Sequence, residues 1–290
     1  MGALPTVREA IRAATATLSD AKSESPRLDA ELLMAEALGV RRDELYAAPE
    51  RRLTEPESAT FAGFVERRGR REPVAYIVGH KAFRMIELQV NENTLIPRPE
   101  TETVVEVVLK ELNRLDKETP LLLDIGTGSG AIALALATEH PRVRVVATEV
   151  HPAPLEMARL NATRLGLAGR VEFIVSDVYD DVPTEAHFDV IVSNPPYVPV
   201  EAMRRLAPEI RGFEPHVALL GGQHGMDFYE RIIPGAPPFL LPGGMLAVEI
   251  NDGRMLETLQ LFIASGRFED IDVRNDLGGL PRVISAREKQ

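Results

Sequence analysis

The sequence predicts an α/β protein with an open, mostly parallel sheet of seven strands, preceded by a small helical bundle. Three observations lead to this fold class. From Leu121 onward, short apolar runs alternate with helical segments, which is the pattern of a parallel sheet covered by helices on both faces. A glycine-rich turn, residues 126–130, follows the first of these runs. Residues 1–75, by contrast, show helical periodicity alone.

Composition excludes several functional classes. The 290-residue chain contains no cysteine, so disulfides, thiolate zinc sites and cysteine nucleophiles are ruled out, and no metal site is predicted. The net charge of −11 argues against tight binding to a nucleic-acid backbone. Because residues 1–75 hold 12 basic and 13 acidic side chains, the acidity lies in the later part, which suits a cationic small molecule or a basic protein partner. Residues 1–18 lack a signal-peptide core and no stretch reaches membrane-spanning length, so we expect a cytoplasmic protein without membrane contact.

Residues 1–75 are predicted to form a helical domain. Apolar residues recur at helical spacing over 7–18, and Ser25-Pro26 opens a second helix that ends at Gly39. Shorter helices are expected around 42–46 and 55–70. Four arginines crowd the end of the last one: Arg67, Arg68, Arg70 and Arg71. The simpler interpretation is a solvated face near the helix C-terminal dipole, and the alternative is a contact patch for an acidic partner surface.

Residues 76–97 are predicted to form a β-hairpin linker, because 76–79, 82–83 and 86–90 are rich in strand-forming residues. The catalytic domain is then expected over 98–290. In the segment Leu95–Glu102, two prolines stiffen a loop directly before a helix. Arg98 and Glu100 are the polar groups of this loop that we expect to contact the substrate. By composition alone, a linker is an equally good interpretation.

The later part of the chain alternates strands with helices in a regular order. Strands are expected at 121–125, 143–148, 170–175, 190–193, 245–250, 268–273 and 282–286, and helices at 131–138, 152–165, 227–239 and 253–265. A short helix is also expected near 201–206, and a turn at 241–244. The connection at Asp276–Gly279 is short enough for a hairpin, so the last two strands are predicted to be antiparallel.

The fourth of these strands, with Phe188 before it, ends abruptly at Asn194-Pro195-Pro196-Tyr197. Two consecutive prolines donate no N–H to a ladder, so Asn194 is held at the carboxyl edge of the sheet, where open α/β sheets bind ligands. Tyr197 adds an aromatic face beside unpaired carbonyls. The group suits a small planar amide or exocyclic amine. A proline-terminated strand with a capping Asn is the simpler interpretation for any one of these residues, and all four together favour a binding site.

The glycine-rich turn Gly126-Thr127-Gly128-Ser129-Gly130 predicts a nucleoside cofactor, because glycine lets a ligand approach the backbone closely. At this point S-adenosylmethionine and NAD are both open, since Glu149 lies where a ribose-binding acid is expected in either case. The fourth strand favours S-adenosylmethionine. A dehydrogenase needs a proton donor or acceptor near the hydride path, whereas methyl transfer to an amide needs positioning only.

If S-adenosylmethionine is the cofactor, the acidic residues that follow two of the strands are expected to bind it. Glu149 is predicted to hold the ribose hydroxyls, and Asp177 to face the adenine amino group with Val178 packed on the ring. The simpler interpretation is that Glu149 and Asp177 cap the helices that follow them.

Several motifs spread over nearly the whole chain resemble those of one family, the HemK/PrmC release-factor glutamine methyltransferases. They are Glu24–Ala30, Glu72-Pro73 with Tyr76-Ile77 and Gly79, Leu95–Glu102, Asp124–Ala133, Asn194–Tyr197, Phe213-Glu214-Pro215 and Asp276-Leu277. The Asn-Pro-Pro-Tyr motif alone is shared with adenine-specific DNA methyltransferases, so an adenine-N6 nucleic-acid methyltransferase is the alternative. A non-catalytic adaptor that binds nucleoside is a second alternative.

The resemblance implies a class I S-adenosylmethionine-dependent methyltransferase fold, with a Rossmann-like sheet. It also implies methylation of the glutamine side chain in the Gly-Gly-Gln loop of class 1 peptide chain release factors, with S-adenosylhomocysteine as product. Asn194, Pro195, Pro196 and Tyr197 would be the catalytic and substrate-binding residues, and Asn194 would also lie next to the cofactor. We further expect a monomer, no direct nucleic-acid binding and a docking surface on the N-terminal bundle. Gly221-Gly222-Gln223 spells the substrate tripeptide, which we interpret as chance.

Overall fold

The computed structural model describes residues 4–289, and residues 1–3 of the predicted N-terminal domain and residue 290 of the predicted catalytic domain lie outside this range. The chain divides into two compact units. The first holds the residues up to His80 together with residues 207–213, and the second holds residues 81–206 and 214–290. Each unit is described by itself below.

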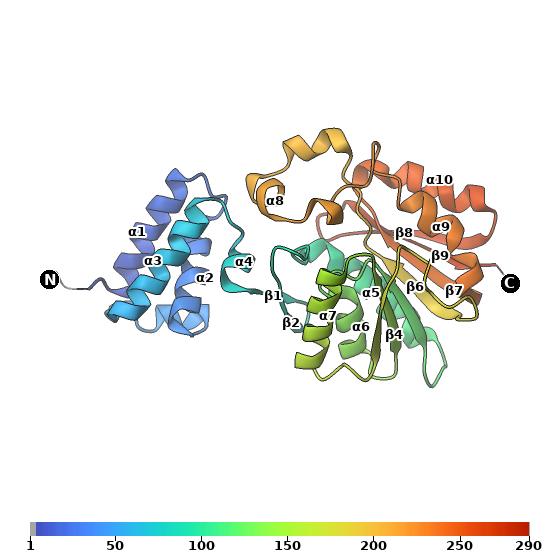
Figure 1. The fold of residues 1–290 in the computed structure, drawn as a ribbon, viewed down its shortest axis with the longest axis horizontal. Helices are drawn as coiled ribbons and strands as arrows, with labels where there is room; N and C mark the ends of the chain where they lie inside the picture. Colours follow the sequence, from blue (N-terminus) through green and yellow to red (C-terminus); the bar gives the residue numbers. More distant parts are fainter. Residues whose placement is uncertain (1–3, 290) are drawn as a thin grey trace. The chain divides into compact units, whose positions relative to one another are not determined.

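The first unit is a helical bundle, as predicted (Figure 1). Its helices are α1 (Val7–Asp20), α2 (Pro26–Leu38), α3 (Glu55–Gly69), α4 (Val74–Val78) and α8 (Pro208–Phe213). Capping boxes start α1 at Thr6 and α3 at Thr54, and each satisfies backbone N–H groups that the first turn leaves unpaired. The core of the bundle contains Leu18, Leu33 and Phe61, all at most 5% exposed.

The prediction of a β-strand at 76–79 is wrong, because these residues belong to α4. Pro73 precedes this single helical turn and Gly79 ends it in the left-handed conformation. The turn buries Tyr76 and Ile77, and Ile77 joins the core of the bundle. Packing therefore overrides the strand propensity of the valines and isoleucine.

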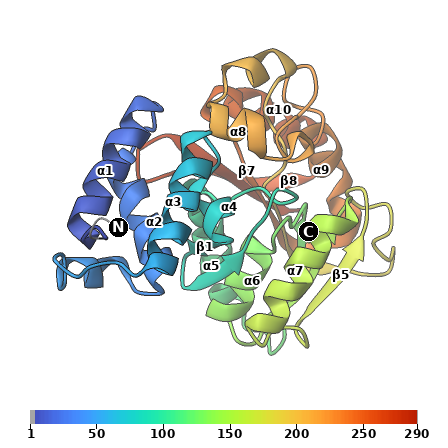
Figure 2. The same ribbon diagram turned by 60° about the vertical axis from the view of Figure 1, so that its left-hand side comes forward.

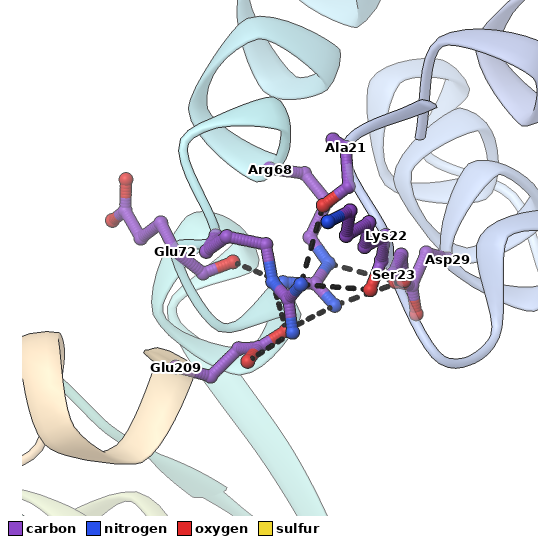
Figure 3. A network of polar contacts seen from close by, with 8 residues as sticks. Ala21, Lys22, Ser23, Asp29, Arg68, Glu72 and Glu209 are labelled. Atoms are coloured by element: carbon purple, nitrogen blue, oxygen red, sulfur yellow. Dashed lines mark hydrogen bonds and ion pairs between the residues drawn. The ribbon is translucent and has the colours of Figure 1, made fainter. Parts of the chain in front are cut away.

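Arginines at the C-terminal end of α3 form ion pairs within the unit, so neither interpretation offered for the cluster holds for Arg68 and Arg71. Arg68 is 6% exposed and its guanidinium donates to Asp29 Oδ2 (2.7 Å) and Ser23 Oγ (3.0 Å) (Figure 3). Glu209 of α8 accepts from Arg68 at 3.0 Å and twice from Arg71, both at 2.7 Å. Residues 207–213 are thus held by the bundle through charge, because α8 contributes no fully buried side chain. The sequence pattern could not show this, since Glu209 lies 141 residues after Arg68.

The second unit is built on a seven-stranded sheet, which confirms the predicted fold class. The strands are β3 (Leu121–Ile125), β4 (Arg144–Glu149), β5 (Val171–Val175), β6 (Phe188–Ser193), β7 (Leu240–Glu249), β8 (Phe268–Asn275) and β9 (Pro281–Glu288). Their order across the sheet is β5-β4-β3-β6-β7-β9-β8. The first five are parallel, and β9 lies antiparallel to both β7 and β8, as expected for a C-terminal hairpin.

Two boundaries differ from prediction around β7. The strand begins at Leu240 and includes residues 241–244, which were expected to form a turn. The pairing with β6 is irregular here: Phe188 pairs with Leu240 and Val190 with Met245, so the extra residues bulge from β7. Gly244 is required there, since a Cβ would lie 3.1 Å from Phe188 O. The preceding helix is shorter than predicted: α9 covers Tyr229–Gly235, and the prolines that follow admit only a short 3₁₀ turn at Pro237–Phe239.

Helices cover both faces of the sheet (Figures 1 and 2). One face carries α5 (Glu102–Arg114), α6 (Ala131–Glu139), α7 (Pro152–Arg164) and the hairpin β1 (His80–Phe83)–β2 (Ile86–Gln89). The other face carries α9 and α10 (Met255–Ser265). Alternate strand residues divide between the two cores, with Val190 on the first face and Ile191 on the second. Within residues 4–289, no helix is both long enough and apolar enough to cross a bilayer.

The strand order creates a switch point beside β3. From β3 the chain builds β4 and β5 on one side, then returns to place β6 and β7 on the other. Connections leave β3 and β6 in opposite directions here, which opens a crevice at the carboxyl ends of these strands. The register places Ile125 opposite both Thr148 and Ser193. Gly126, Glu149 and Asn194, which follow these three residues, therefore meet at one edge of the sheet.

Candidate active site

A cleft opens at this carboxyl edge. Most of the predicted site residues line it: Gly126, Gly128, Glu149, Asp177, Val178, Asn194, Pro195 and Pro196. Its remaining wall includes Asn93 and Leu95 before α5, Val217 and Ala218, and Phe228 and Ile232 at α9, none of which was predicted as a site residue. Thr127, Ser129, Gly130, Tyr197, Arg98 and Glu100 are the predicted site residues outside the lining.

The glycine turn offers bare backbone to the cleft. Gly126 and Gly128 have φ values of +73° and +56°, and a Cβ added at either would meet no atom within 4 Å. Both therefore combine the left-handed conformation that glycine tolerates with open space in front of the chain. Gly130 is required for a different reason. It also has positive φ, and a Cβ there would lie 2.8 Å from Leu134 Cδ1 of α6.

Thr127 points into the protein, and Thr127 and Ser129 both make contacts that shape the turn. Thr127 Oγ1 donates to Asp124 Oδ2 at 2.7 Å, and Ser129 O accepts from Asn161 Nδ2 at 3.0 Å. Both residues are buried. These contacts hold the turn from below and engage the Thr127 hydroxyl and the Ser129 backbone oxygen.

Glu149 is anchored at the mouth of the cleft by two backbone donors. Its Oε2 accepts from Gly128 N at 3.1 Å, and its Oε1 accepts from His151 N at 3.2 Å. Burial raises the pKa of this carboxyl above its ordinary value, while the backbone hydrogen bonds from His151 and Gly128 act in the opposite direction. The carboxylate thus ties the end of β4 to the glycine turn after β3.

Asp177 and Val178 follow β5 on the same edge. Asp177 Oδ1 lies 2.9 Å from Arg231 Nη1, an ion pair that was not predicted, and both side chains remain close to half exposed. Val178 has φ +58°, which is unfavourable for a β-branched residue. Its side chain is nevertheless buried in the core beneath α9 while it lines the cleft.

Asn194 stands where β6 ends, with its side chain held by a partner from α5's entry turn. Asn194 Nδ2 donates to Thr101 Oγ1 at 3.1 Å. In the part of the chain that the structure describes, this is the side chain's only hydrogen bond, so its Oδ1 is left to accept from a ligand. Pro195 and Pro196 continue along the cleft wall.

The loop after Asn194 is backed by residues 217–225. Val198 N donates to Leu219 O (2.8 Å) and Gly221 N to Val198 O (3.0 Å). A Cβ on Gly221 would lie 2.6 Å from Pro196 O and 2.8 Å from Tyr197 Cα. Gly221, the first residue of the Gly-Gly-Gln tripeptide in this chain, therefore has a packing role against the motif.

Tyr197 packs behind the cleft against the α9–α10 core. Burial is the main cause that raises the pKa of its hydroxyl to about 12, so the ring stays neutral near physiological pH. Arg98 forms an ion pair with Glu214, which is 4% exposed and also accepts from Ile96 N at 3.3 Å. Glu100 is exposed. The roles predicted for these residues in substrate binding stay predictions.

Three buried polar residues near the site were not predicted as site residues: Asp124, Thr101 and Glu249. Asp124 Oδ2 accepts from Thr127 Oγ1 and Ala133 N, whereas its Oδ1 has no partner among the described residues. Burial raises the pKa of Asp124 to about 7 and that of Glu249 to about 7. An acidic residue within or at the end of an otherwise apolar strand was the available signal for both.

The residues present fit S-adenosylmethionine. Bare glycine backbone gives close approach, the Glu149 carboxylate offers acceptors for ribose hydroxyls, and Val178 presents an apolar surface. Asp177, which also lines the cleft, is close to half exposed and forms its ion pair with Arg231 through one carboxylate oxygen. A carboxylate at each end of an apolar cleft suits a nucleoside with hydroxyl and amino donors.

Comparisons with known proteins agree with this site. Residues 9–79 match the PrmC N-terminal domain, and residues 102–209 match the methyltransferase small domain. The release factor glutamine methyltransferase of Bradyrhizobium diazoefficiens is 42% identical over 97% of this chain and 95% of that protein. The one from Rhodopirellula baltica is 39% identical over 92% of this chain and 90% of that protein. Among solved structures, a methyltransferase from Pyrococcus furiosus shares the fold, with a TM-score of 0.53 and 21% identity over 72% of this chain and 92% of that one.

Proposed function

Because this chain belongs to the release factor glutamine methyltransferase family, we propose that it methylates the glutamine side-chain amide nitrogen in the Gly-Gly-Gln loop of class 1 peptide chain release factors. The methyl donor is S-adenosylmethionine and the product is S-adenosylhomocysteine. One observation carries the proposal. The Asn194-Pro195-Pro196 wall and the open glycine turn face the same cleft at the switch point of the sheet.

The cofactor site is formed by the ends of β3, β4 and β5. Gly126 and Gly128 would lie against the cofactor, Glu149 would accept from the ribose hydroxyls, and Asp177 with Val178 would take the adenine end. When bound, S-adenosylmethionine supplies an electrophilic methyl group on a positively charged sulfur. The negative charge of Glu149 and Asp177 at this edge favours a cationic ligand.

The substrate amide is positioned by Asn194 and Pro195. A carboxamide nitrogen is a poor nucleophile because its lone pair is delocalised into the carbonyl, so orientation has to supply much of the rate. Asn194 Oδ1 and the Pro195 carbonyl would each accept one N–H of the glutamine amide, which directs the nitrogen lone pair toward the cofactor side of the cleft. Fixing two reactants in this way is worth on the order of 7–11 kcal/mol of barrier. Both acceptors favour the developing positive charge on nitrogen.

Docking of the release factor is proposed for the helical unit. A groove runs along α1 and α2 and is lined by apolar and basic residues that include Ile11, Arg12, Leu45 and Tyr46. Tyr46 is 56% exposed, as expected for an aromatic side chain at a binding surface. A flexible tripeptide loop supplies few contacts of its own, so a second surface would raise affinity. We also propose that the protein acts as a monomer without direct contact to nucleic acid, in line with its acidic charge.

The test is a labelling experiment with three arms. The protein is incubated with methyl-tritiated S-adenosylmethionine and a release factor, the same factor with Gly-Gly-Gln changed to Gly-Gly-Ala, or duplex DNA. We expect label in the intact release factor only, located by mass spectrometry on the amide nitrogen of the glutamine. Label in DNA, or equal label in the altered factor, would overturn the proposal.

A further inference from the structure

We propose that Asn161 of α7 is a positioning residue that ties two walls of the cleft together and so pre-organises the site for S-adenosylmethionine. The inference rests on the proposed function in taking that cofactor as the ligand of the cleft. Asn161 lies in none of the motifs that predicted the site, and the described residues that line the cleft do not include it.

The Asn161 side chain makes three hydrogen bonds inside the second unit. It is 1% exposed and lies within the helix α7. Its Oδ1 accepts from Gln89 N at 2.8 Å, and its Nδ2 donates to Gln89 O and to Ser129 O, both at 3.0 Å. One amide group therefore joins α7 to the end of β2 and to the glycine turn after β3.

The orientation of this amide follows from its partners. A backbone N–H can only donate and a backbone carbonyl can only accept. The Asn161 oxygen must therefore face Gln89 N, and its nitrogen must face the two carbonyls. A turn of the amide by 180° would lose all three hydrogen bonds. An ionised acid or an apolar side chain at this position could not donate to Ser129 O.

The first segment that Asn161 holds continues into the cleft wall. Gln89 ends β2, and the chain then turns and reaches the cleft at Asn93 and Leu95. This turn is closed by two hydrogen bonds, from Thr94 N to Asn91 O at 3.0 Å and from Asn91 N to Thr94 Oγ1 at 3.2 Å. Because the turn is short and closed, the position of the β2 end sets the position of this wall.

The second segment is the glycine turn itself. Ser129 lies between Gly128, which lines the cleft, and Gly130, which precedes α6. Three glycines in five residues give the chain little intrinsic preference for one conformation. The hydrogen bond from Asn161 to Ser129 O restrains it. Without that restraint, part of the binding free energy of the cofactor would be spent on ordering the turn, which lowers affinity.

The residue type is otherwise unfavourable at this position. Asparagine favours caps and turns over the interior of a helix, and a buried amide must replace the hydrogen bonds that water would give it. Its neighbours on the same face of α7, Ala158 and Ala162, are apolar and at most 1% exposed. Alanine at position 161 would favour the helix more. The three hydrogen bonds to the cleft segments account for the amide.

The test measures cofactor affinity in the full chain without a release factor, by calorimetry with S-adenosylhomocysteine. Asn161→Ala removes all three hydrogen bonds, whereas Asn161→Asp keeps the shape and the acceptor for Gln89 N but loses both donors. For Asn161→Ala we expect Kd to rise about tenfold, the size expected when one or two hydrogen bonds that pre-organise a site are lost. Asn161→Asp should lose at least as much affinity.

Val143→Ala is the matched control for lost stability. Val143 is fully buried in the core that α7 covers, but it directly precedes β4 and so lies at the opposite edge of the sheet from the cleft. This variant should unfold at lower urea concentration and keep Kd within about twofold of wild type, since one such factor is well below the loss of a hydrogen bond.

Hydrogen exchange of the ligand-free protein is a readout that does not depend on the cofactor. The amides of residues 89–95 and 126–130 should exchange faster in Asn161→Ala than in the wild type, and at the wild-type rate in Val143→Ala. With a release factor present, KM for S-adenosylmethionine should rise about tenfold in Asn161→Ala while kcat at saturating cofactor stays within about threefold, because a residue that acts on cofactor binding alone changes KM.

The outcomes separate this inference from the proposed function. If the wild type binds S-adenosylhomocysteine but methylates no release factor, the proposed substrate is wrong, and the affinity and exchange comparisons still test Asn161. A Kd close to wild type in Asn161→Ala or in Asn161→Asp would overturn the positioning role. An equal loss of affinity in Val143→Ala would overturn it as well, because the effect would then be one of general destabilisation.

Discussion

Replacing Arg68 by Ala is expected to destabilise the helical unit by about 3 kcal/mol. The change removes four hydrogen bonds, to Asp29 Oδ2 (2.7 Å), Ser23 Oγ (3.0 Å), Glu209 Oε1 (3.0 Å) and Glu72 O (3.2 Å). Breaking a buried ion pair on one side costs roughly 3–5 kcal/mol, because a charge is left buried without a partner.

The lower end of that range applies here for a structural reason. Glu209 keeps both of its 2.7 Å hydrogen bonds to Arg71, and Asp29 keeps the Ser23 hydroxyl at 2.6 Å. Only Asp29 therefore loses its compensating cation. Because Glu209 still has Arg71, residues 207–213 should loosen without detaching.

The assay is urea unfolding followed by circular dichroism at 222 nm, with hydrogen exchange of the amides of residues 207–213 as a local readout. Arg70→Ala is the matched control, since Arg70 and its partner Glu66 are 68% and 69% exposed and such a pair is worth about 0–1 kcal/mol. Arg68→Met keeps most of the apolar stem and should lose nearly as much as Arg68→Ala if charge is the cause. A loss below about 1 kcal/mol, or equal losses for Arg68→Ala and Arg70→Ala, would refute this reasoning.

Three further outcomes follow from the second unit. Asn194→Ala should lower the rate of methyl transfer on the order of 100-fold or more, while the affinity for S-adenosylhomocysteine, measured by calorimetry, stays close to wild type. Loss of that affinity would show that the residue acts on the cofactor instead. Gly221→Ala places a methyl group 2.6 Å from Pro196 O, so kcat should fall about 10–100-fold, whereas Gly212→Ala, whose Cβ meets no atom within 4 Å, should leave turnover unchanged. The pKa of Glu249 is raised from 4.5 to about 7 in the folded protein. As pH rises, Glu249 therefore loses its proton in the unfolded chain before it does so in the folded chain. The free energy of unfolding that the protonated Glu249 contributes falls between about pH 4.5 and pH 7. Urea unfolding at pH 5 and pH 8 should therefore show Glu249→Gln gaining stability over the wild type only at the higher pH, and an equal difference at both values would contradict the raised pKa.

Local sequence patterns were sufficient to predict most helices and strands and to identify the motif residues. The strand that ends at Asn194-Pro195 could be recognised because β-branched residues run into two prolines, and the glycine turn because it interrupts an apolar strand. Local patterns failed where distant packing decided the conformation. Residues 76–79 are helical because Ile77 completes the bundle core, and residues 241–244 belong to β7 as extra residues that bulge opposite β6.

Residue types at short spacing along the chain were enough to predict the fold class, the family and the edge of the sheet at which the site lies. The residues that contact the Asn-Pro-Pro-Tyr motif from elsewhere in the chain could be identified from the folded protein alone. Thr101, whose hydroxyl accepts from Asn194 Nδ2, lies 93 residues before it, and Gly221 packs against Pro196 from a separate loop. Hydrogen bonds and burial between such distant segments arise when the sheet assembles, so a linear pattern carries no direct trace of them.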